Sequence, residues 1–381
     1  MAIWIVEPRD PLIFRSGKPF EALPGARANS LPFPYPSTIA GAIRTREGLD
    51  DSGAFQTKEI PRVKAIAVQG PFLVELNDSG DIEHWLLPAP GDAVLLKQRS
   101  SKEKALLKHL VPVKMLPGAA TNLPEDLSLV GFARPAREKP HDGTPLYWYW
   151  EHFKDWLLNP EEKTVILNEI GNTGPFFEIP RMHVAINPAT RTALEHALFQ
   201  TQGLEFTDAG RKRLALAVET AANNITPGIA PLGGERRLAE WRKSKKKLPV
   251  GPDELFSNII KDRHCRVILL TPAYFKAGWK PGWLLSPHED VKVELQAIAL
   301  QRHQVVSGWD MELRRPKPTR RLAPAGTVLF LKLEGNDDAV GKWAKKMWMS
   351  AISDDQQDRL DGFGLAVLGQ WDGARQSMEV S

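Results

Sequence analysis

Few residues of this chain stand at spacings that support bond-breaking chemistry. His288 opens the sequence His288-Glu289-Asp290, but no second histidine follows four residues later, as a zinc protease motif requires. Asp253-Glu254 and Asp354-Asp355 are adjacent acidic pairs, whose side chains point apart on a helix or a strand and do not by themselves build a two-metal site. The chain has neither a P-loop nor a nucleophile elbow. We therefore expect no catalytic residue, no metal and no cofactor.

One histidine stays open as a general acid–base candidate. His183 lies in the strand-like run Arg181-Met182-His183-Val184, beside an arginine. A positioned histidine could activate a ribose hydroxyl without a metal. The same residue could equally contact phosphate or have a structural role, so Arg181 and His183 are candidate binding residues.

The glycine-rich segment near the C-terminus is a candidate for close contact with a ligand. Gly362 and Gly364 precede an apolar strand, and glycine lets backbone amides approach a phosphate or ribose. The segment partly matches the RRM strand motif, but Leu365 and Leu368 replace the aromatic residues that stack on bases. We therefore predict contact through backbone amides rather than base stacking, and a plain tight turn is the alternative.

The N-terminal segment combines basic side chains with a helix start. A strand runs into a proline-stiffened loop, and a helix is expected over residues 37–46 with Ser37 as its N-cap. Free amides at a helix N-terminus attract anions; the alternative is that Gly41 serves close packing on the sheet. The candidate anion-binding residues here are Arg9, Arg15, Lys18, Ser37, Thr38 and Arg44.

Basic residues are clustered although the net charge is only +4 and the pI about 9.0. Residues 236–247 hold seven Lys and Arg against one acidic residue, and residues 314–321 hold five against none. Smaller basic stretches lie at 97–108 and 134–139. Each run could be a solvated loop, but together they favour a polyanionic partner. Arg236 and Arg237 are the candidates from the first run.

These candidates would be positioned by short strands and few helices. Proline (31) and glycine (29) are spread along the 381 residues, and the 42% hydrophobic fraction suits a globular chain. A second helix is expected over 338–352. We predict an α+β fold with antiparallel sheets, each covered by helices on one face. The expected strands are 3–6, 63–68, 72–76, 181–186, 214–219, 266–271, 293–299, 328–333 and 365–368.

At about 150 residues per domain, the length favours two domains. The first is predicted over 1–205, with a large irregular insertion at about 88–174, and the second over 206–381. No run of about 18 apolar residues suggests a membrane span. The N-terminus does not resemble a signal peptide, and the single cysteine, Cys265, excludes an internal disulfide. A cytoplasmic location is expected.

An ordered series of segments gives the chain a family resemblance. Together they resemble the RAMP superfamily of CRISPR proteins, built on ferredoxin-like (RRM-like) domains, and more narrowly the third subunits of type III-B Cmr effector complexes. The segments are Glu7-Pro8-Arg9-Asp10-Pro11-Leu12-Ile13-Phe14-Arg15, Gly17-Lys18-Pro19-Phe20, Pro36-Ser37-Thr38-Ile39-Ala40-Gly41-Ala42-Ile43-Arg44, Arg181-Met182-His183-Val184, Pro231-Leu232-Gly233-Gly234-Glu235-Arg236-Arg237, Ser307-Gly308-Trp309-Asp310, Pro316-Lys317-Pro318, Ala325-Gly326-Thr327-Val328 and the C-terminal glycine-rich strand.

The resemblance implies two tandem ferredoxin-like domains and a non-catalytic role. Such a subunit binds and caps the 5′ handle of the guide crRNA. It docks the large polymerase-like subunit beside the backbone RAMP subunits, and meets target RNA only indirectly. A thumb-like hairpin would come from the insertion or from residues 181–205. Ser16 and Lys18 replace the Asp and Arg common in the family, which weakens a phosphate-clamp role for that loop.

The sequence leaves three alternative functions open. A RAMP endoribonuclease would process precursor crRNA with His183. The equivalent handle-capping subunit of a type III-A complex makes nearly the same physical claims. A purely architectural subunit would turn its basic runs toward protein.

Overall fold

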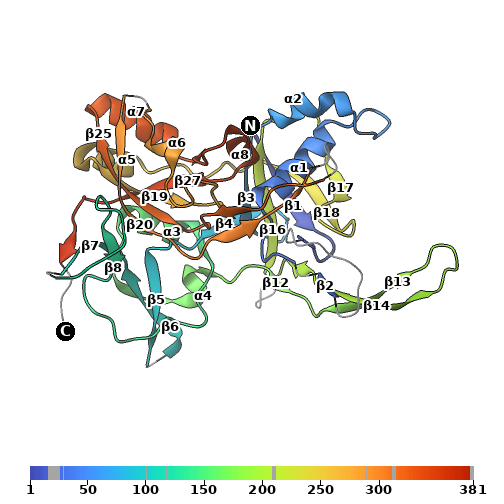
Figure 1. Cartoon of the computed structure of the whole chain (residues 1–381), viewed down its shortest axis with the longest axis horizontal. Coiled ribbons are helices and arrows are strands. Elements are labelled where there is room, and N and C mark those ends of the chain that lie inside the picture. Colours follow the sequence, from blue (N-terminus) through green and yellow to red (C-terminus); the bar gives the residue numbers. More distant parts are fainter. Residues whose placement is uncertain are drawn as a thin grey trace.

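The computed structural model describes residues 1–15, 26–28, 30–99, 101–116, 118–207, 212–288, 290–310 and 315–377. Two antiparallel sheets dominate this part of the chain (Figure 1). The first has the order β11 (Gly171–Asn172), β9 (Tyr147–Tyr149), β4 (Ile82–Pro88), β3 (Val68–Leu76), β16 (Arg213–Thr220), β1 (Ala2–Pro8), β18 (Leu238–Ser244) and β17 (Gly228–Pro231). The second has the order β20 (Lys292–Ala299), β25 (Val328–Glu334), β19 (His264–Leu269), β27 (Leu365–Gln370) and β26 (Ser350–Ala351).

The inner faces of the two sheets contribute to one core. Alternation along β1 sends Ile3 and Ile5 into this core, where Ile268 and Phe330 of the second sheet also lie. On the opposite side of β1, Trp4 and Val6 pack with the helix α1 (Pro36–Glu47). The outer face of the second sheet packs on α5 (Asp253–Asp262) and α7 (Asp337–Met347). The predicted α+β class with antiparallel sheets is confirmed.

The predicted irregular insertion is more ordered than expected. It contains a three-stranded sheet, β10 (Lys163–Ile166), β6 (Ser101–His109) and β5 (Ala93–Gln98), and the helix α3 (Trp150–Leu158). Its aromatic residues at 147–149 form β9 and join the first sheet. These strands were not predicted from the sequence because basic residues interrupt their apolar pattern. Only one face of β6, at Ala105 and Leu107, is apolar and buried.

Small sheets and short helices complete the described chain. A projecting hairpin, β13 (Arg181–Ile186) with β14 (Ala193–Thr201), pairs in parallel with β2 (Ala26–Ala28). The remaining strands are β7 (Val111–Lys114), β8 (Leu129–Gly131), β12 (Phe176–Phe177), β15 (Leu204–Glu205), β21 (Gln304–Val306), β22 (Trp309–Asp310), β23 (Arg315–Pro316), β24 (Arg320–Leu322) and β28 (Gln376–Ser377). The short helices are η1 (Thr57–Glu59), α2 (Ile60–Lys64), α4 (Leu167–Ile170), α6 (Gly282–Leu285) and α8 (Gln356–Asp361).

Three sequence predictions need correction. Only Val68 of the strand expected over 63–68 lies in a strand, because α2 occupies 60–64 and β3 begins at Val68. The helix expected over 338–352 ends at Met347, and residues 350–351 pair with β27. The chain changes sheets after β18, and not at the predicted 205/206 boundary, because β16 and β18 both pair with β1.

No helix among the described residues is long and apolar enough to cross a membrane.

Candidate nucleic-acid interface

Four of the predicted arginines gather at one end of the first sheet. Residues 9–15 follow β1, and residues 232–237 connect β17 to β18. These two loops are held together because Gly234 N donates to Ile13 O at 2.7 Å. At Gly233, φ is +79° and an added Cβ would lie 2.5 Å from Ile13 O, so this close approach requires glycine. We call the resulting group the arginine corner: Arg9, Arg15, Arg236 and Arg237.

The arginine corner is only partly neutralised. Arg9 pairs with Glu240 and Arg15 with Glu235, while both guanidinium groups stay about half exposed, at 50% and 49%. Arg236 is exposed and stands in the left-handed region, with φ +52°. Within the described residues, the buried Nε of Arg237 has no hydrogen-bond partner. In the described chain, the corner therefore has one buried unsatisfied donor and two half-exposed ion pairs in which an anion could replace the carboxylate.

The hairpin β13–β14 leaves the body beside the corner. Its base is fixed by two hydrogen bonds, from Leu12 N to Leu204 O at 3.0 Å and from Leu204 N to Leu12 O at 2.7 Å. Figure 1 shows the hairpin extending away from both sheets. Val184 pairs with Leu198 across the hairpin, so the two side chains share a face. Met182 and Ile186 stand on the same side of their strand, and these four residues are 38–58% exposed.

The other face of the hairpin holds the predicted Arg181 and His183. Arg181 pairs with Glu178 at 2.8 Å. The imidazole of His183 stacks on Phe199, with ring centroids 5.3 Å apart and an angle of 18° between planes. Its Nε2 lies 2.8 Å from Thr201 Oγ1, which is a hydroxyl and not a carboxylate. Sequence reasoning missed Phe199, because only the strand register shows that it faces His183.

The predicted helix start lies elsewhere. α1 begins at Pro36 with Tyr35 as its N-cap, so Ser37 is not the cap; proline suits the first helical position, where no N–H is needed. The Thr38 amide already donates to Tyr35 O at 2.9 Å. Tyr35 in turn contacts the ring of Phe363 in the C-terminal half, with centroids 6.4 Å apart. This helix start belongs to the junction between the halves.

Arg44 is also part of that junction. Its guanidinium pairs with Asp361 and donates to Ile66 O at 2.9 Å and Leu360 O at 3.2 Å. Its side chain is only 11% exposed. Arg44 therefore ties α1 to α8, and we no longer place it in an RNA site.

The glycine-rich segment has no free amides to offer. Gly362 N donates to Arg359 O at 3.2 Å, and Gly364 N donates to Pro272 O at 2.8 Å. Both glycines are buried. A Cβ at Gly362 would lie 2.7 Å from Val68 O, so this glycine allows the segment to pack on β3. The prediction that these amides contact a ligand is corrected: the glycines serve close packing.

Lys18 lies outside the described residues. The structure thus brings Arg9, Arg15, Arg236 and Arg237 together, with Arg181 and His183 on the adjoining hairpin. It separates from them Ser37, Thr38, Arg44, Gly362 and Gly364. The basic residues that follow the corner in β18 have different environments. Arg242 pairs with Glu7 at 2.7 Å, whereas Lys243 lies exposed over the ring of Trp4.

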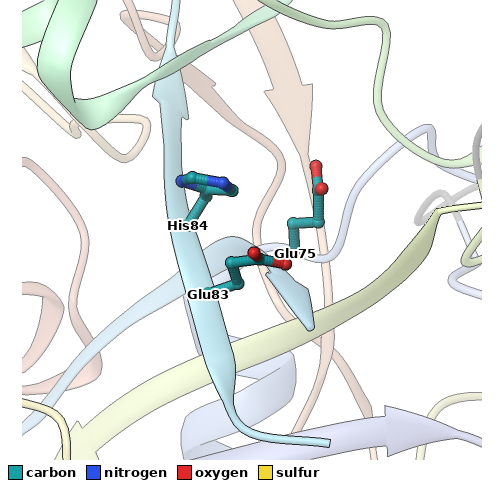
Figure 2. A group of neighbouring side chains, drawn as sticks. All are labelled: Glu75, Glu83 and His84. Atoms are coloured by element: carbon teal, nitrogen blue, oxygen red, sulfur yellow. The ribbon is translucent and has the colours of Figure 1, made fainter. Parts of the chain in front are cut away.

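One group of side chains has oxygen and nitrogen atoms at a spacing that could hold a metal ion (Figure 2). Ligand atoms of Glu75, Glu83 and His84 lie within 4.8 Å of one another. An extra residue in β4 breaks the register with β3 here, which puts Glu83 and His84 on one side. Glu75, however, already accepts from Lys212 Nζ at 3.0 Å and Tyr149 Oη at 2.8 Å. Lys212 supplies the positive charge at this group.

An apolar cleft of about 350 Å³ lies at the junction of the two halves. Prolines and aromatic rings make up much of its wall, including Phe33, Tyr35 and Tyr147. No charged side chain lines it among the described residues. The cleft therefore does not suit a phosphate.

Comparison with known protein families assigns the chain to a class of proteins. Residues 4–371 match the family described as CRISPR-associated protein (Cas_Cmr3), and this nearly complete coverage defines the chain as a CRISPR-associated protein. The chain belongs to the Cmr3 family. The family resemblance predicted from the sequence is confirmed.

The chain is also similar to three solved structures. Two are titled as type III-B Cmr-beta bound to cognate target RNA, one of them also with AMPPnP. Each is 17% identical, with 86% of both chains covered and TM-scores of 0.47 and 0.46. The third, titled as a Csm3–Csm4 subcomplex of a type III-A complex, is 11% identical with a TM-score of 0.34, and 86% of this chain and 92% of that chain are covered. No curated protein sequence matches the chain.

Proposed function

We propose that this chain is the subunit that binds and caps the 5′ handle of the guide crRNA in its effector complex. The observation that carries the proposal is the arginine corner with an apolar hairpin rising beside it. Half-exposed guanidinium groups at Arg9 and Arg15 can exchange their carboxylate partners for phosphate. Phosphate contacts of this kind position an extended strand and supply most of its affinity.

The hairpin β13–β14 is proposed to be the thumb-like element. The sequence left open whether the insertion or residues 181–205 supply it, and β13–β14 has both the projection and the exposed apolar face. Met182, Val184 and Leu198 would separate neighbouring bases. On the opposite face, the His183–Phe199 pair gives an aromatic surface on which a base could stack.

We propose that the chain itself does not cleave RNA. His183 faces the Thr201 hydroxyl and an aromatic ring, an environment that orients the imidazole without supplying a charged partner. Incubation with repeat RNA in EDTA tests this. Intact RNA supports the binding role, whereas specific cleavage that disappears in His183→Ala would establish the endoribonuclease instead.

Two finer points of architecture are part of the proposal. The strands β18, β1, β16 and β3 stand in the order 4-1-3-2 of a βαββαβ unit, and β27, β19, β25 and β20 repeat it. We propose that each set is a ferredoxin-like domain. We also propose docking to the large polymerase-like subunit and the backbone subunits, with indirect contact to target RNA. Co-purification with each partner tests the docking, and failure with all of them contradicts it.

RNA binding by the purified chain tests the central claim. We expect handle-containing RNA to bind more tightly than scrambled RNA of equal length, and Arg236→Ala with Arg237→Ala to reduce that affinity. Each lost phosphate contact should also lower the salt slope by about 0.7. The matched control is Arg302→Ala with Arg321→Ala, which removes two exposed arginines elsewhere. Equal binding by the wild type and the corner variant would remove these arginines from the site.

Photo-crosslinking on the assembled complex gives the second test. We expect the 5′ terminus of the guide to attach to this chain. Should it attach only to other subunits, the capping role is wrong.

A further inference from the structure

Two basic stretches outside the arginine corner meet in the structure. Lys97 N donates to Lys139 O at 2.9 Å, and His141 N donates to Leu95 O at 2.8 Å, so the chain at 139–141 runs along β5. The ring of His141 reaches the next strand, where its Nε2 lies 3.1 Å from Lys102 O. Residues from both stretches therefore form one surface on the insertion. We call it the insertion surface: Arg99, Lys102, Lys104, Arg137 and Lys139.

The strand pattern of β6 holds this surface toward solvent. Lys102 and Lys104 are two residues apart, so they leave the same face of the strand. The next odd-numbered positions, Ala105 and Leu107, are buried in the core shared by the two sheets. The basic side chains are thus carried by a packed element and not by a loose loop.

The five basic side chains of the insertion surface are exposed. None of them forms an ion pair with another residue in the described part of the chain. This distinguishes them from Arg9, Arg15 and Arg181, each of which has a carboxylate partner. A side chain without a carboxylate partner gains a phosphate contact without losing an existing one.

Two acidic residues, Glu103 and Glu138, lie among the five basic ones, and Lys97 at the edge already pairs with Asp142. The surface therefore keeps an excess of positive charge. Lysine ammonium groups contact phosphate as point charges and carry no sequence information. Such a surface suits the backbone of a strand whose sequence varies.

We propose that the insertion surface binds the phosphate backbone of single-stranded RNA outside the 5′ handle. In Figure 1, β5 and β6 lie well apart from β13–β14. The surface is thus a second contact, separate from the arginine corner. It adds to the proposed function and does not require it, since a strand of any sequence would bind there.

The experiment compares two RNAs on the purified full-length chain. One carries the handle alone, and the other carries the handle with a polyuridine extension at its 3′ end. We expect the extension to tighten binding, and Lys102→Gln, Lys104→Gln and Lys139→Gln together to abolish that gain while leaving handle binding unchanged. Three lost phosphate contacts should also reduce the salt slope for the extended RNA by about 2.

The matched control is Lys58→Gln, Lys261→Gln and Lys280→Gln, three exposed lysines elsewhere whose removal changes the net charge equally. This control should keep the gain. The proposal is wrong if the extension gives no gain in the wild type, or if the insertion-surface variant keeps it. A variant that binds both RNAs normally but no longer joins the effector complex would assign the surface to an acidic protein partner instead. Loss of handle preference with the polyuridine gain intact would contradict the proposed function alone.

Discussion

Asp92 and Arg266 form an ion pair in which both side chains are fully buried, with Arg266 Nη1 2.6 Å from Asp92 Oδ2. Trp156 Nε1 donates to the other carboxylate oxygen at 2.9 Å. Arg266 also donates through Nε to Gln370 O at 2.9 Å and through Nη2 to Trp156 O at 2.6 Å. The pair thus joins the insertion, including α3, to the second sheet. Its hydrogen bonds offset the free-energy cost of removing both charges from water.

Removing one member of this pair should be strongly destabilising. Asp92→Ala leaves the guanidinium of Arg266 buried without its counter-charge, and we expect the free energy of unfolding to fall by about 3–5 kcal/mol. Urea titration measures it. Asp142→Ala, which removes the partner of Lys97 in an exposed pair, should leave the midpoint nearly unchanged. The double variant Asp92→Leu with Arg266→Met should be more stable than Asp92→Ala, because no charge is left buried without a partner. A double variant that is less stable than Asp92→Ala would contradict this interpretation of the pair.

The same pair predicts a pH dependence. Burial by itself raises the pKa of Asp92, but the attraction of Arg266, His109 and the hydrogen bond from Trp156 outweigh it and lower this pKa to about 2. A carboxyl whose pKa is lower in the folded state stabilises the fold above its unfolded pKa, about 3.9, and this stabilisation is lost as the pH falls toward 2. The difference in unfolding free energy between the wild type and Asp92→Asn should therefore shrink from about pH 5 downward. A constant difference would show that Asp92 does not titrate in this way.

Two glycine substitutions should have opposite effects. Gly362→Ala meets a positive φ of +92° and places a Cβ 2.7 Å from Val68 O, so we expect a loss of more than about 1 kcal/mol. Gly41→Ala lies in α1 with open space around the new methyl group, so we expect a gain of about 0.5–1 kcal/mol. Urea unfolding measures both. Handle affinity of the folded protein should stay unchanged in each, since neither residue lies in the arginine corner; a specific loss in Gly362→Ala would restore the glycine segment as an RNA contact.

Loss of an acidic residue from the arginine corner should strengthen RNA binding. Glu235 pairs with Arg15, and Glu235→Gln removes this carboxylate charge from the guanidinium, which favours contact with phosphate. We expect handle affinity to rise a few-fold at low salt and the gain to fade at high salt, because exposed charges are screened. Filter binding over a salt series measures this. Glu59→Gln, which removes an acidic partner of Arg62 away from the corner, is the control. Unchanged affinity in Glu235→Gln would place Arg15 outside the path of the RNA.

Strands with regular apolar patterns could be predicted from the sequence. The expected strands 214–219 and 293–299 lie within β16 and β20, because alternating or continuous apolar residues reach a buried face. β6 was missed, since four of its first residues are polar or charged and only tertiary packing buries the rest. The helix start at Pro36 differs from the predicted cap at Ser37 by less than one turn.

The residues of the arginine corner could be selected from the sequence, but their proximity could not. Arg9, Arg15, Arg236 and Arg237 lie together because two loops adjoin, and the family segments already named both. Arg44 was misassigned because its partner Asp361 is 317 residues away, a distance over which local patterns carry no information. Gly362 looked like a ligand contact for the same reason: the close neighbour that requires glycine is a carbonyl of β3.

The core shared by both sheets has a consequence for how a guide strand is laid out. Leu95 and Leu107 of the insertion sit in that core with Ile5 of β1, the strand that leads into the corner. This shared core fixes the insertion surface and the arginine corner relative to each other. A strand that touches both must adopt a path of set length, whatever its sequence.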